Sequence, residues 1–355
     1  MNREGPFDPA LARLQQQVRE AVAARTPLRI VGGDTKRHLR GSADAEALCM
    51  SAYRGITDYT PAELVVVARA GTPLAEIEDA LSERGQRLAF EPPRTGDGAT
   101  LGGMLGAGLA GPSRPWTAAV RDHVLGVTML GNDGELLRYG GQVMKNVAGY
   151  DVPRLVVGAW GTLGPVVEVA LRVVPSPAVS RCFGWVCPLE EARAWTRRTG
   201  LRPWPITGLC HDGAALHLRL EGAGSAVQAA VAALPGDARE EPPVFFEQLR
   251  DWELEFFHAP GVLWRCTVPA NAETGKLAGD MLWDWGGALR WLRTTGLAAG
   301  VPTAAASVGG TARTFDSGFA GATPVTVLRQ ALETRVRFAF DPVGVFSGNA
   351  AVTGD

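Results

Sequence analysis

Three glycine-rich passages are the parts of this 355-residue chain whose residue types suit binding chemistry. The longest, PPRTGDGATLGGMLGAGLAGPSRPWTAAVRD at 92–122, has almost no helical period and is too long for an ordinary connection. The other two adjoin apolar strands and read Gly32-Gly33-Asp34-Thr35 and Gly161-Thr162-Leu163-Gly164. Glycine lets backbone N–H groups approach an anion closely. If the fold brings them together, the passages predict a composite site for an anion and a ring.

The passages lack the signatures of the common nucleotide-binding loops. No GxGxxG opens a helix directly after a strand with an acid about 20 residues later, and no GxxxxGK[ST] occurs. A strand that ends in two glycines is also a common structural turn. Each passage taken alone therefore leaves that interpretation open.

Few side chains are candidates for acid–base chemistry, since the chain has only five histidines. His211 and His217 lie six apart in CHDGAALH, which we interpret as one strand that places both on the same face. The alternative to a functional pair is an ordinary strand histidine with a neighbour, because no third metal ligand follows closely. Lys145, near Tyr150 and Asp151, is either a base or part of a loop that caps and salt-bridges beside the glycine-rich site. No catalytic residue and no metal site are assigned.

Composition narrows the expected partners and location. The formal net charge is −2, the isoelectric point is about 6.3 and no dense Lys/Arg run occurs, so nucleic acid is not expected. The sequence has no signal segment and no apolar run of bilayer length, so we expect a cytoplasmic protein whose only membrane association would be peripheral, on the inner face and through partners. The scattered cysteines form no CxxC, which predicts no local iron–sulfur motif and fits a reducing compartment: Cys49, Cys182, Cys187, Cys210 and Cys266.

Local patterns predict the elements that must position these passages. The expected elements are, in chain order, a helix from Asp8 to Arg25, a strand at 28–31, a strand at 64–68, a helix with Thr72 as N-cap that ends near Gly85, a hairpin around 131–134, a strand at 167–173 and a helix around 328–336.

The composition shifts near residue 178, because eight of the ten tryptophans lie beyond residue 180. There we expect strands at ALHLRL and VLWRC and helices at SAVQAAVAAL and AETGKLAGDMLWDW. The tryptophans pack a core or, as a set, form a partner surface. The predicted fold is α+β, with a binding domain at 1–177, a smaller α+β cap or interface domain at 178–324, and a C-terminal helix and tail at 325–355 that return to the first domain.

In the same chain order, the three passages resemble the flavin-contacting segments of the vanillyl-alcohol-oxidase-type (PCMH-type) FAD-binding fold, over about residues 26–175 and the C-terminal end. The resemblance implies an FAD cofactor and a two-subdomain FAD-binding domain. It implies pyrophosphate contacts at Gly32, Gly33, Asp34, Thr35, Thr100, Leu101, Gly102 and Gly103. It implies flavin-ring contacts along Gly108, Gly111, Arg121 and Asp122, and adenosine contacts at Gly161, Thr162, Gly164, Val166 and Val167. FDPVGVF at 340–346 resembles the closing motif of the fold.

A narrower resemblance rests on VMKNVAGYD at 143–151 and SRPWTAAVRD at 113–122, which are similar to the FAD-binding E-subunit family of bacterial glycolate oxidases. It implies oxidation of glycolate to glyoxylate by a complex with a catalytic FAD-containing subunit and an iron–sulfur subunit. Related hydroxy-acid dehydrogenases carry a histidine pair and an acid in the second domain. Because this chain lacks that constellation, substrate chemistry is expected on the sister subunit.

Two departures from the family pattern bear on the cofactor. Covalently flavinylated members have a histidine in the first glycine loop, where this chain has Asp34 with His38 beyond it, so a non-covalent flavin is implied. The closing motif usually continues to Asn-Pro-Gly, and residues 347–349 here are Ser-Gly-Asn. A stand-alone FAD-dependent 2-hydroxy-acid or alcohol oxidase, and a non-catalytic assembly subunit with a structural flavin, remain the alternatives.

Overall fold

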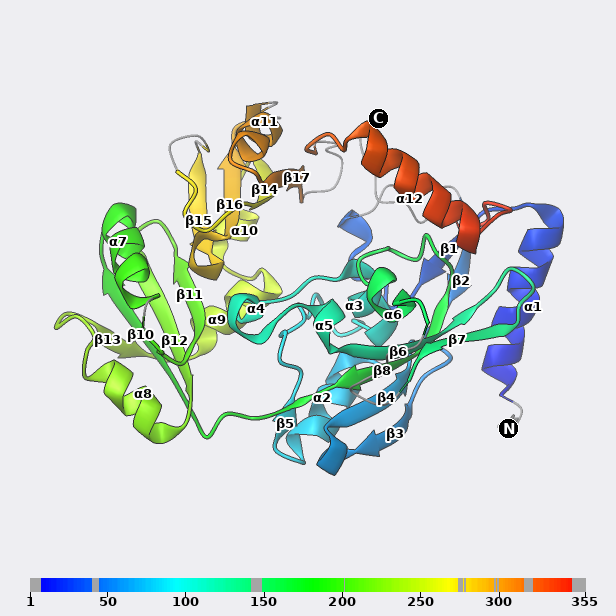
Figure 1. The fold of residues 1–355 in the computed structure, drawn as a ribbon, viewed down its shortest axis with the longest axis horizontal. Coiled ribbons are helices and arrows are strands. Elements are labelled where there is room, and N and C mark those ends of the chain that lie inside the picture. Colours follow the sequence, from blue (N-terminus) through cyan, green and yellow to red (C-terminus); the bar gives the residue numbers. More distant parts are fainter. Residues whose placement is uncertain are drawn as a thin grey trace.

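The computed structural model describes residues 8–39, 45–141, 149–200, 202–273, 277, 279–296, 298, 300–315 and 322–346. The chain forms two sheet-centred parts that lie side by side (Figure 1). Strands before residue 178 build the first part, and strands after it build an eight-stranded sheet. The exact domain boundaries at 177 and 324 stay a prediction. In the described ranges, no helix combines the length and apolar character required to cross a membrane.

A five-stranded antiparallel sheet forms the centre of the first part. Its strands, in sheet order, are β3 (Ile56–Thr60), β4 (Val65–Arg69), β8 (Val166–Arg172), β6 (Val124–Leu130) and β7 (Leu136–Gly140). Short helices pack near it: α2 (Leu74–Ser82), α3 (Leu101–Ala107), α4 (Arg114–Thr117), α5 (Val120–His123), α6 (Val152–Leu155) and the 3-10 turn η2 (Pro61–Glu63). Fully buried apolar side chains from β4, β8, α2 and α3 form one core.

A smaller layer carries the first glycine passage. The parallel strands β1 (Leu28–Val31) and β2 (Glu46–Cys49) pack against α1 (Pro9–Ala24), and the 3-10 turn η1 (Arg37–Leu39) follows β1. Asp8 caps α1 as predicted, because its side chain accepts from the N–H groups of residues 10 and 11. A two-stranded pair, β5 (Gln86–Arg87) with β9 (Val174–Pro175), leads into the second part.

The second part is an eight-stranded sheet with helices around it. Its strands, in sheet order, are β13 (Arg239–Glu241), β10 (Val179–Val186), β12 (Ala215–Gly222), β11 (Ile206–His211), β15 (Asp280–Asp284), β16 (Leu289–Thr294), β14 (Val262–Thr267) and β17 (Thr311–Thr314). The helices are α7 (Leu189–Thr199), α8 (Gly224–Val231), α9 (Val244–Asp251), α10 (Glu255–His258), η4 (Trp285–Gly287) and α11 (Gly300–Ser307).

After the second sheet the chain returns to the first part through α12 (Val327–Phe340) (Figure 1). Val336 and Phe340 pack against the core of the first sheet, and Phe346 packs beside α1 and β1. The carboxylate of Asp341 accepts hydrogen bonds from the N–H groups of Gly344, Val345 and Phe346. FDPVGVF is therefore a tight turn closed on its own aspartate.

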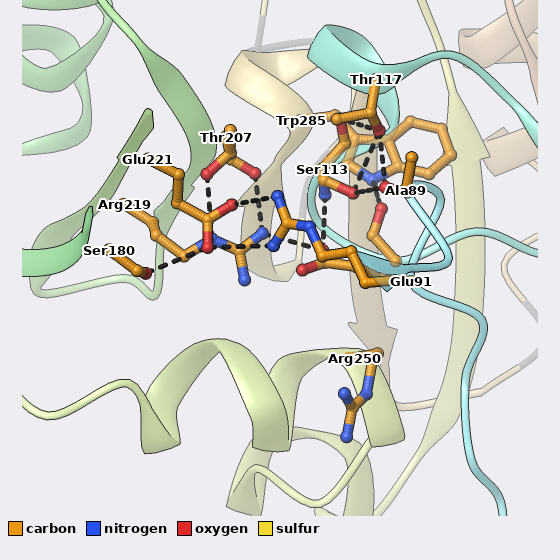
Figure 2. Close-up of polar contacts among 12 residues, drawn as sticks. Ala89, Glu91, Ser113, Thr117, Ser180, Thr207, Arg219, Glu221, Arg250 and Trp285 are labelled. Carbon is orange, nitrogen blue, oxygen red and sulfur yellow. Dashed lines mark hydrogen bonds and ion pairs between the residues drawn. The ribbon is translucent and has the colours of Figure 1, made fainter. Parts of the chain in front are cut away.

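A charged network joins the two parts (Figure 2). Arg87 at the end of β5 forms an ion pair with Glu221 of β12, with 2.7 Å between Nη2 and Oε2. Arg219, in the same strand β12, donates to Glu91 of the first part, with 2.8 Å between Nη2 and Oε2. The side chains of Glu91, Arg219 and Glu221 are almost fully withdrawn from solvent. These contacts span more than a hundred residues of sequence and fix one sheet against the other.

Three sequence-based predictions of local structure are wrong. CHDGAALH is a hairpin that joins β11 to β12, because Asp212 accepts from the N–H groups of residues 214 and 215 and turns the chain. AETGKLAGDMLWDW contains the strand β15, which pairs along its length with β16, so tertiary pairing outweighs its helical pattern. The passage at 92–122 contains the short helices α3, α4 and α5. The helix expected to have Thr72 as its N-cap begins one residue later than predicted, with Pro73 as N-cap and Leu74 as its first residue.

Candidate functional site

The first glycine passage turns sharply after β1. A Cβ atom on Gly33 would collide with the carbonyl oxygen of Gly98, and one on Gly32 would collide with Thr100 Oγ1, so only glycine fits at either position. Within the described chain, the backbone N–H groups of residues 32 to 36 donate to no protein acceptor. Consecutive N–H groups without protein acceptors form an anion-binding concavity.

The second passage is a short helix whose N–H groups are already engaged. Thr100 caps α3 by accepting from Gly103, with 3.2 Å between Oγ1 and N. The N–H groups of Leu101 and Gly102 donate to the carbonyls of residues 72 and 70. A Cβ on Gly102 would press against Ala70. The start of α3 therefore lines the site with closely packed backbone, and its first N–H groups are not free to donate to a ligand.

The third passage is tied to the far end of α3. Gly158 and Trp160 donate their N–H groups to the carbonyls of Leu105 and Gly106, each at 3.0 Å. Gly108 ends α3 in the left-handed conformation, and a Cβ there would lie 2.9 Å from Gly158. The fold thus brings the three glycine passages together, as the sequence predicted.

These segments line a cavity of about 870 Å³, a volume that includes space open to solvent. Ten of the predicted site residues line it, namely Gly32, Gly33, Asp34, Thr35, Thr100, Gly102, Gly103, Gly161, Gly164 and Val166. The other seven do not belong to its lining, namely Leu101, Gly108, Gly111, Arg121, Asp122, Thr162 and Val167. Leu101 and Val167 are core side chains, and the carboxylate of Asp122 accepts from Ala119 N.

Sequence reasoning missed several lining residues, of which Lys36 is the most informative. Lys36 is 8% exposed, and its Nζ donates to the carbonyl of Pro93 at 3.4 Å. Burial lowers the pKa of Lys36 to about 8, against the opposing pull of Asp251. A buried cation beside free N–H groups adds to the attraction for an anion. The sequence GGDTK could have indicated this residue, because the lysine follows the glycine pair by only three positions.

Most other missed lining residues are apolar, and only the fold brings them to the cavity. They include Ile30, Met50, Ala70, Ala107, Val156 and Trp160. Ala107 and Trp160 also belong to an aromatic cluster that continues into the second sheet. One end of the cavity therefore reaches the junction between the two parts.

The two candidate histidines lie in the second part, in separate strands rather than on one face of a single strand. His211 ends β11 and contacts the carbonyl of Cys187, with 2.8 Å between Nε2 and O. His217, in β12, lies between the carboxylates of Asp212 and Glu241 at 3.1 and 2.9 Å and stacks on Phe245. The side-chain hydrogen bonds from these carboxylates outweigh burial and raise the pKa of His217. Both histidines have structural contacts, and Lys145 lies outside the described residues.

A cradle of free N–H groups, a buried lysine and a cavity with largely apolar walls, in an α+β fold, are features suited to a dinucleotide cofactor. Residues 11–140 match the family model of the FAD binding domain. The solved structure of alkyldihydroxyacetonephosphate synthase has the same fold, with a TM-score of 0.66 at 13% identity over 94% of this chain and 74% of that one.

The sequence comparison is more specific. The chain is 43% identical to glycolate oxidase subunit GlcE of Escherichia coli (strain K12) over 347 residues, 98% of each protein. A shorter stretch of 82 residues is 38% identical to glycolate oxidase subunit GlcD of Bacillus subtilis (strain 168), covering 23% of this chain and 17% of that protein. The chain belongs to the family of glycolate oxidase subunit GlcE. The predicted α+β FAD-binding fold, the cofactor and the family resemblance are confirmed.

Proposed function

We propose that this chain is the FAD-binding subunit of a glycolate oxidase complex, which oxidises glycolate to glyoxylate. The observation that carries the proposal is the 43% identity to a subunit of that name over 98% of both proteins. The cavity supports it, because the cavity is bordered by the segments for which the sequence predicted FAD contacts. FAD would accept the hydride equivalent, two electrons and one proton, from the carbon of the hydroxy acid, and the hydroxyl proton would pass to a base.

The residues of the first loop are suited to the pyrophosphate. The N–H groups of residues 32 to 36 can donate to the pyrophosphate without giving up a protein acceptor, and the ammonium group of Lys36 adds a positive charge. The carboxylate of Asp34 lies 3.2 Å from Arg29 and 3.9 Å from Arg37. These arginines engage the carboxylate, and the loop has no histidine at this position, which supports a non-covalent flavin.

A complex with other subunits is supported by the surface of α12. None of the fourteen residues of this helix is buried, and Leu328, Leu332 and Phe338 are 81%, 59% and 68% exposed. An apolar surface of this kind is typical of a partner contact. We propose a catalytic flavoprotein and an iron–sulfur protein as the partners. The contacts that occupy His211 and His217 support oxidation of the hydroxy acid on the sister flavoprotein.

Flavin stoichiometry tests this proposal. The full chain, purified alone, is expected to carry about one FAD that acid precipitation releases into the supernatant. Gly33→Ala is expected to lose the flavin while keeping its circular dichroism spectrum, because the added methyl collides with Gly98 O. Gly236→Ala is the matched control, since no atom lies within 4 Å of a Cβ there.

The outcomes separate the alternatives. A folded chain without flavin would contradict the proposal. Anaerobic bleaching of the flavin by glycolate in the isolated chain would favour a stand-alone oxidase. Full activity of a reconstituted complex containing flavin-free Gly33→Ala chain would favour an assembly subunit.

A further inference from the structure

Three arginines gather on the aromatic cluster at the end of the cavity. Arg114 of α4 lies over the ring of Trp285, with 4.6 Å between Cζ and the ring centroid. Arg265 of β14 lies 5.3 Å from the same ring and 5.7 Å from that of Trp291. Arg313 of β17 lies 5.7 Å from the ring of Phe315. Helix α4 of the first part and strands β14 and β17 of the second part therefore place three guanidinium groups on one aromatic cluster.

Strand pairing places two of these cations directly opposite each other. Arg265 and Arg313 are register partners in the antiparallel pair β14–β17. Like charges at opposed positions of a sheet destabilise it. The cost is visible in the pKa of Arg265, which burial lowers to about 9 with further lowering by Arg313 and Arg114.

Asp122 attracts Arg114 and Asp284 attracts Arg265, but in the part of the chain that the structure describes no carboxylate lies within ion-pair distance of the three arginines. None of the three arginines forms a salt bridge there, and the hydrogen bond from Arg265 to Thr267, at 3.4 Å, is to a hydroxyl. Asp284 is the buried acid that attracts Arg265; burial raises the pKa of its carboxyl group, and the charges of Arg265 and Arg219 oppose that rise. No ion pair joins Asp284 to Arg265 among the described residues, and its Oδ1 instead accepts from the N–H group of Trp285.

Other buried arginines of the second sheet have protein acceptors, although Nη1 of Arg290 has none. Arg219 is paired with Glu91, and Arg290 donates to the carbonyls of Gly287 and Ala272. Arg293 likewise donates to backbone carbonyls. Arg114, Arg265 and Arg313 are half-buried, and among the described residues none of them donates to a carboxylate or a backbone carbonyl. The acceptor they lack is an anion.

The location of the cluster indicates which anion. Ala107 and Trp160 line the cofactor cavity and also belong to the aromatic cluster that contains Trp285, Trp291 and Phe315. The arginines do not themselves line the cavity, so an anion bound there would lie on the far side of this shared cluster. The bulky rings beside the guanidinium groups favour a small, planar acid, and guanidinium groups match the two oxygens of a carboxylate.

The loop that carries Arg114 is held in place by the junction. Ser113 donates its N–H to Glu91 and its hydroxyl to the carbonyl of Ala89, at 3.1 and 2.8 Å (Figure 2). Trp285 donates from Nε1 to the carbonyl of Gly111 at 3.0 Å. The cation and the ring beneath it are thus fixed by the same contacts that join the two sheets, as a preorganised site requires.

We propose that Arg114, Arg265 and Arg313 form a binding site on this subunit for a short 2-hydroxy or 2-oxo carboxylate, beside the aromatic cluster that Ala107 and Trp160 share with the cavity. The choice of acid rests on the proposed function. Binding here is compatible with oxidation on a sister subunit, because the cluster supplies cations and the reaction also needs a base.

Isothermal calorimetry of the full-length, flavin-loaded chain with oxalate, at constant ionic strength, tests the site. Oxalate is expected to bind with a one-to-one stoichiometry and to shift the visible spectrum of the flavin. Arg265→Gln and Arg313→Gln are each expected to weaken oxalate about 10- to 100-fold, the usual effect of losing a charged hydrogen-bond partner. Arg265→Lys is expected to retain part of the affinity.

Arg181→Gln is the matched control, because Arg181 lies in the same sheet and is paired with Glu240 at the surface. It is expected to bind oxalate with unchanged affinity. The proposal would be overturned by absent oxalate binding, by unchanged affinity in both glutamine variants, or by equally tight binding of inorganic phosphate. Arg114→Gln, on another element, repeats the test if a strand variant fails to fold. Flavin content is measured on each sample, so loss of the proposed cofactor is distinguished from loss of this site.

Discussion

Two groups of arginines at the junction of the sheets differ in how their charge is balanced. Arg87 and Arg219 are matched by the carboxylates of Glu221 and Glu91. The cluster of Arg114, Arg265 and Arg313 has no carboxylate partner among the described residues. The two groups are connected, because Ser113 binds Glu91 while its neighbour Arg114 faces Trp285. The paired arginines hold the two parts of the molecule together, whereas the unpaired arginines can bind a ligand.

Breaking the matched group should have the largest effect on stability. Arg219→Met would leave Glu91 without its ion-pair partner in a site only 12% exposed, and Glu221 would lose a nearby positive charge. Removal of one member of a buried pair costs about 3–5 kcal/mol. The unfolding midpoint in urea, converted with the fitted slope, measures the loss. A change under about 1 kcal/mol would contradict the assigned role of the network.

A second prediction concerns Lys36, a buried cation whose proposed partner is the cofactor. Its pKa of about 8 lies below the ordinary value, so its charge destabilises the empty chain below that pH. A bound pyrophosphate favours the charged form. FAD affinity should therefore be constant below about pH 8 and fall above it, by at most about tenfold per pH unit.

Fluorescence titration of deflavinated chain with FAD at pH 7, 8 and 9 measures this dependence. Lys36→Met is expected to bind FAD more weakly at pH 7 and to show a flat profile across the range. An equal pH dependence in the variant and the unaltered chain would rule Lys36 out as the source. The result decides whether the positive charge of Lys36 acts on the bound cofactor, as the arginine cluster is proposed to act on a carboxylate.

The glycine site was predictable from sequence because its signals are local. Two local patterns predict a close approach of the backbone, whatever the rest of the fold. One is the strand that ends in Gly32-Gly33, and the other is the glycine turn before β8. The free N–H groups also follow from this local turn. The engaged N–H groups of α3 could not be foreseen, since their acceptors at residues 70 and 72 lie on a distant segment.

The arginine cluster was missed for the same reason. Arg265 and Arg313 lie in short strands 48 positions apart, and only the register of β14 with β17 makes them neighbours. The hairpin between His211 and His217 carried a local signal, an aspartate followed by glycine, which was outweighed by the apolar run after it. Tertiary pairing also converted the apparent helix around residue 282 into β15.

Neutralising one member of the unmatched group should act in the opposite sense to Arg219→Met. In the absence of a bound anion, Arg313→Gln removes repulsion from Arg265 and is expected to leave stability unchanged or raise it by up to about 1 kcal/mol. Thermal melting with and without oxalate measures both states. The stabilisation by oxalate seen in the unaltered chain should shrink in the variant. A loss of 2 kcal/mol or more, on the order of a broken buried hydrogen bond, would show that Arg313 has a protein partner.

The smallest effect is expected where a matched pair lies at the surface. Arg181 pairs with Glu240 at 2.6 Å, with side chains 29% and 52% exposed. Water screens such a pair, so Arg181→Gln should change the unfolding free energy by no more than about 0.5 kcal/mol, and less at high salt. The same urea titration serves as the measurement. Because Arg181 and Arg219 lie in paired strands of one sheet and differ mainly in burial, a similar loss in both variants would mean that burial does not explain the strength of the junction.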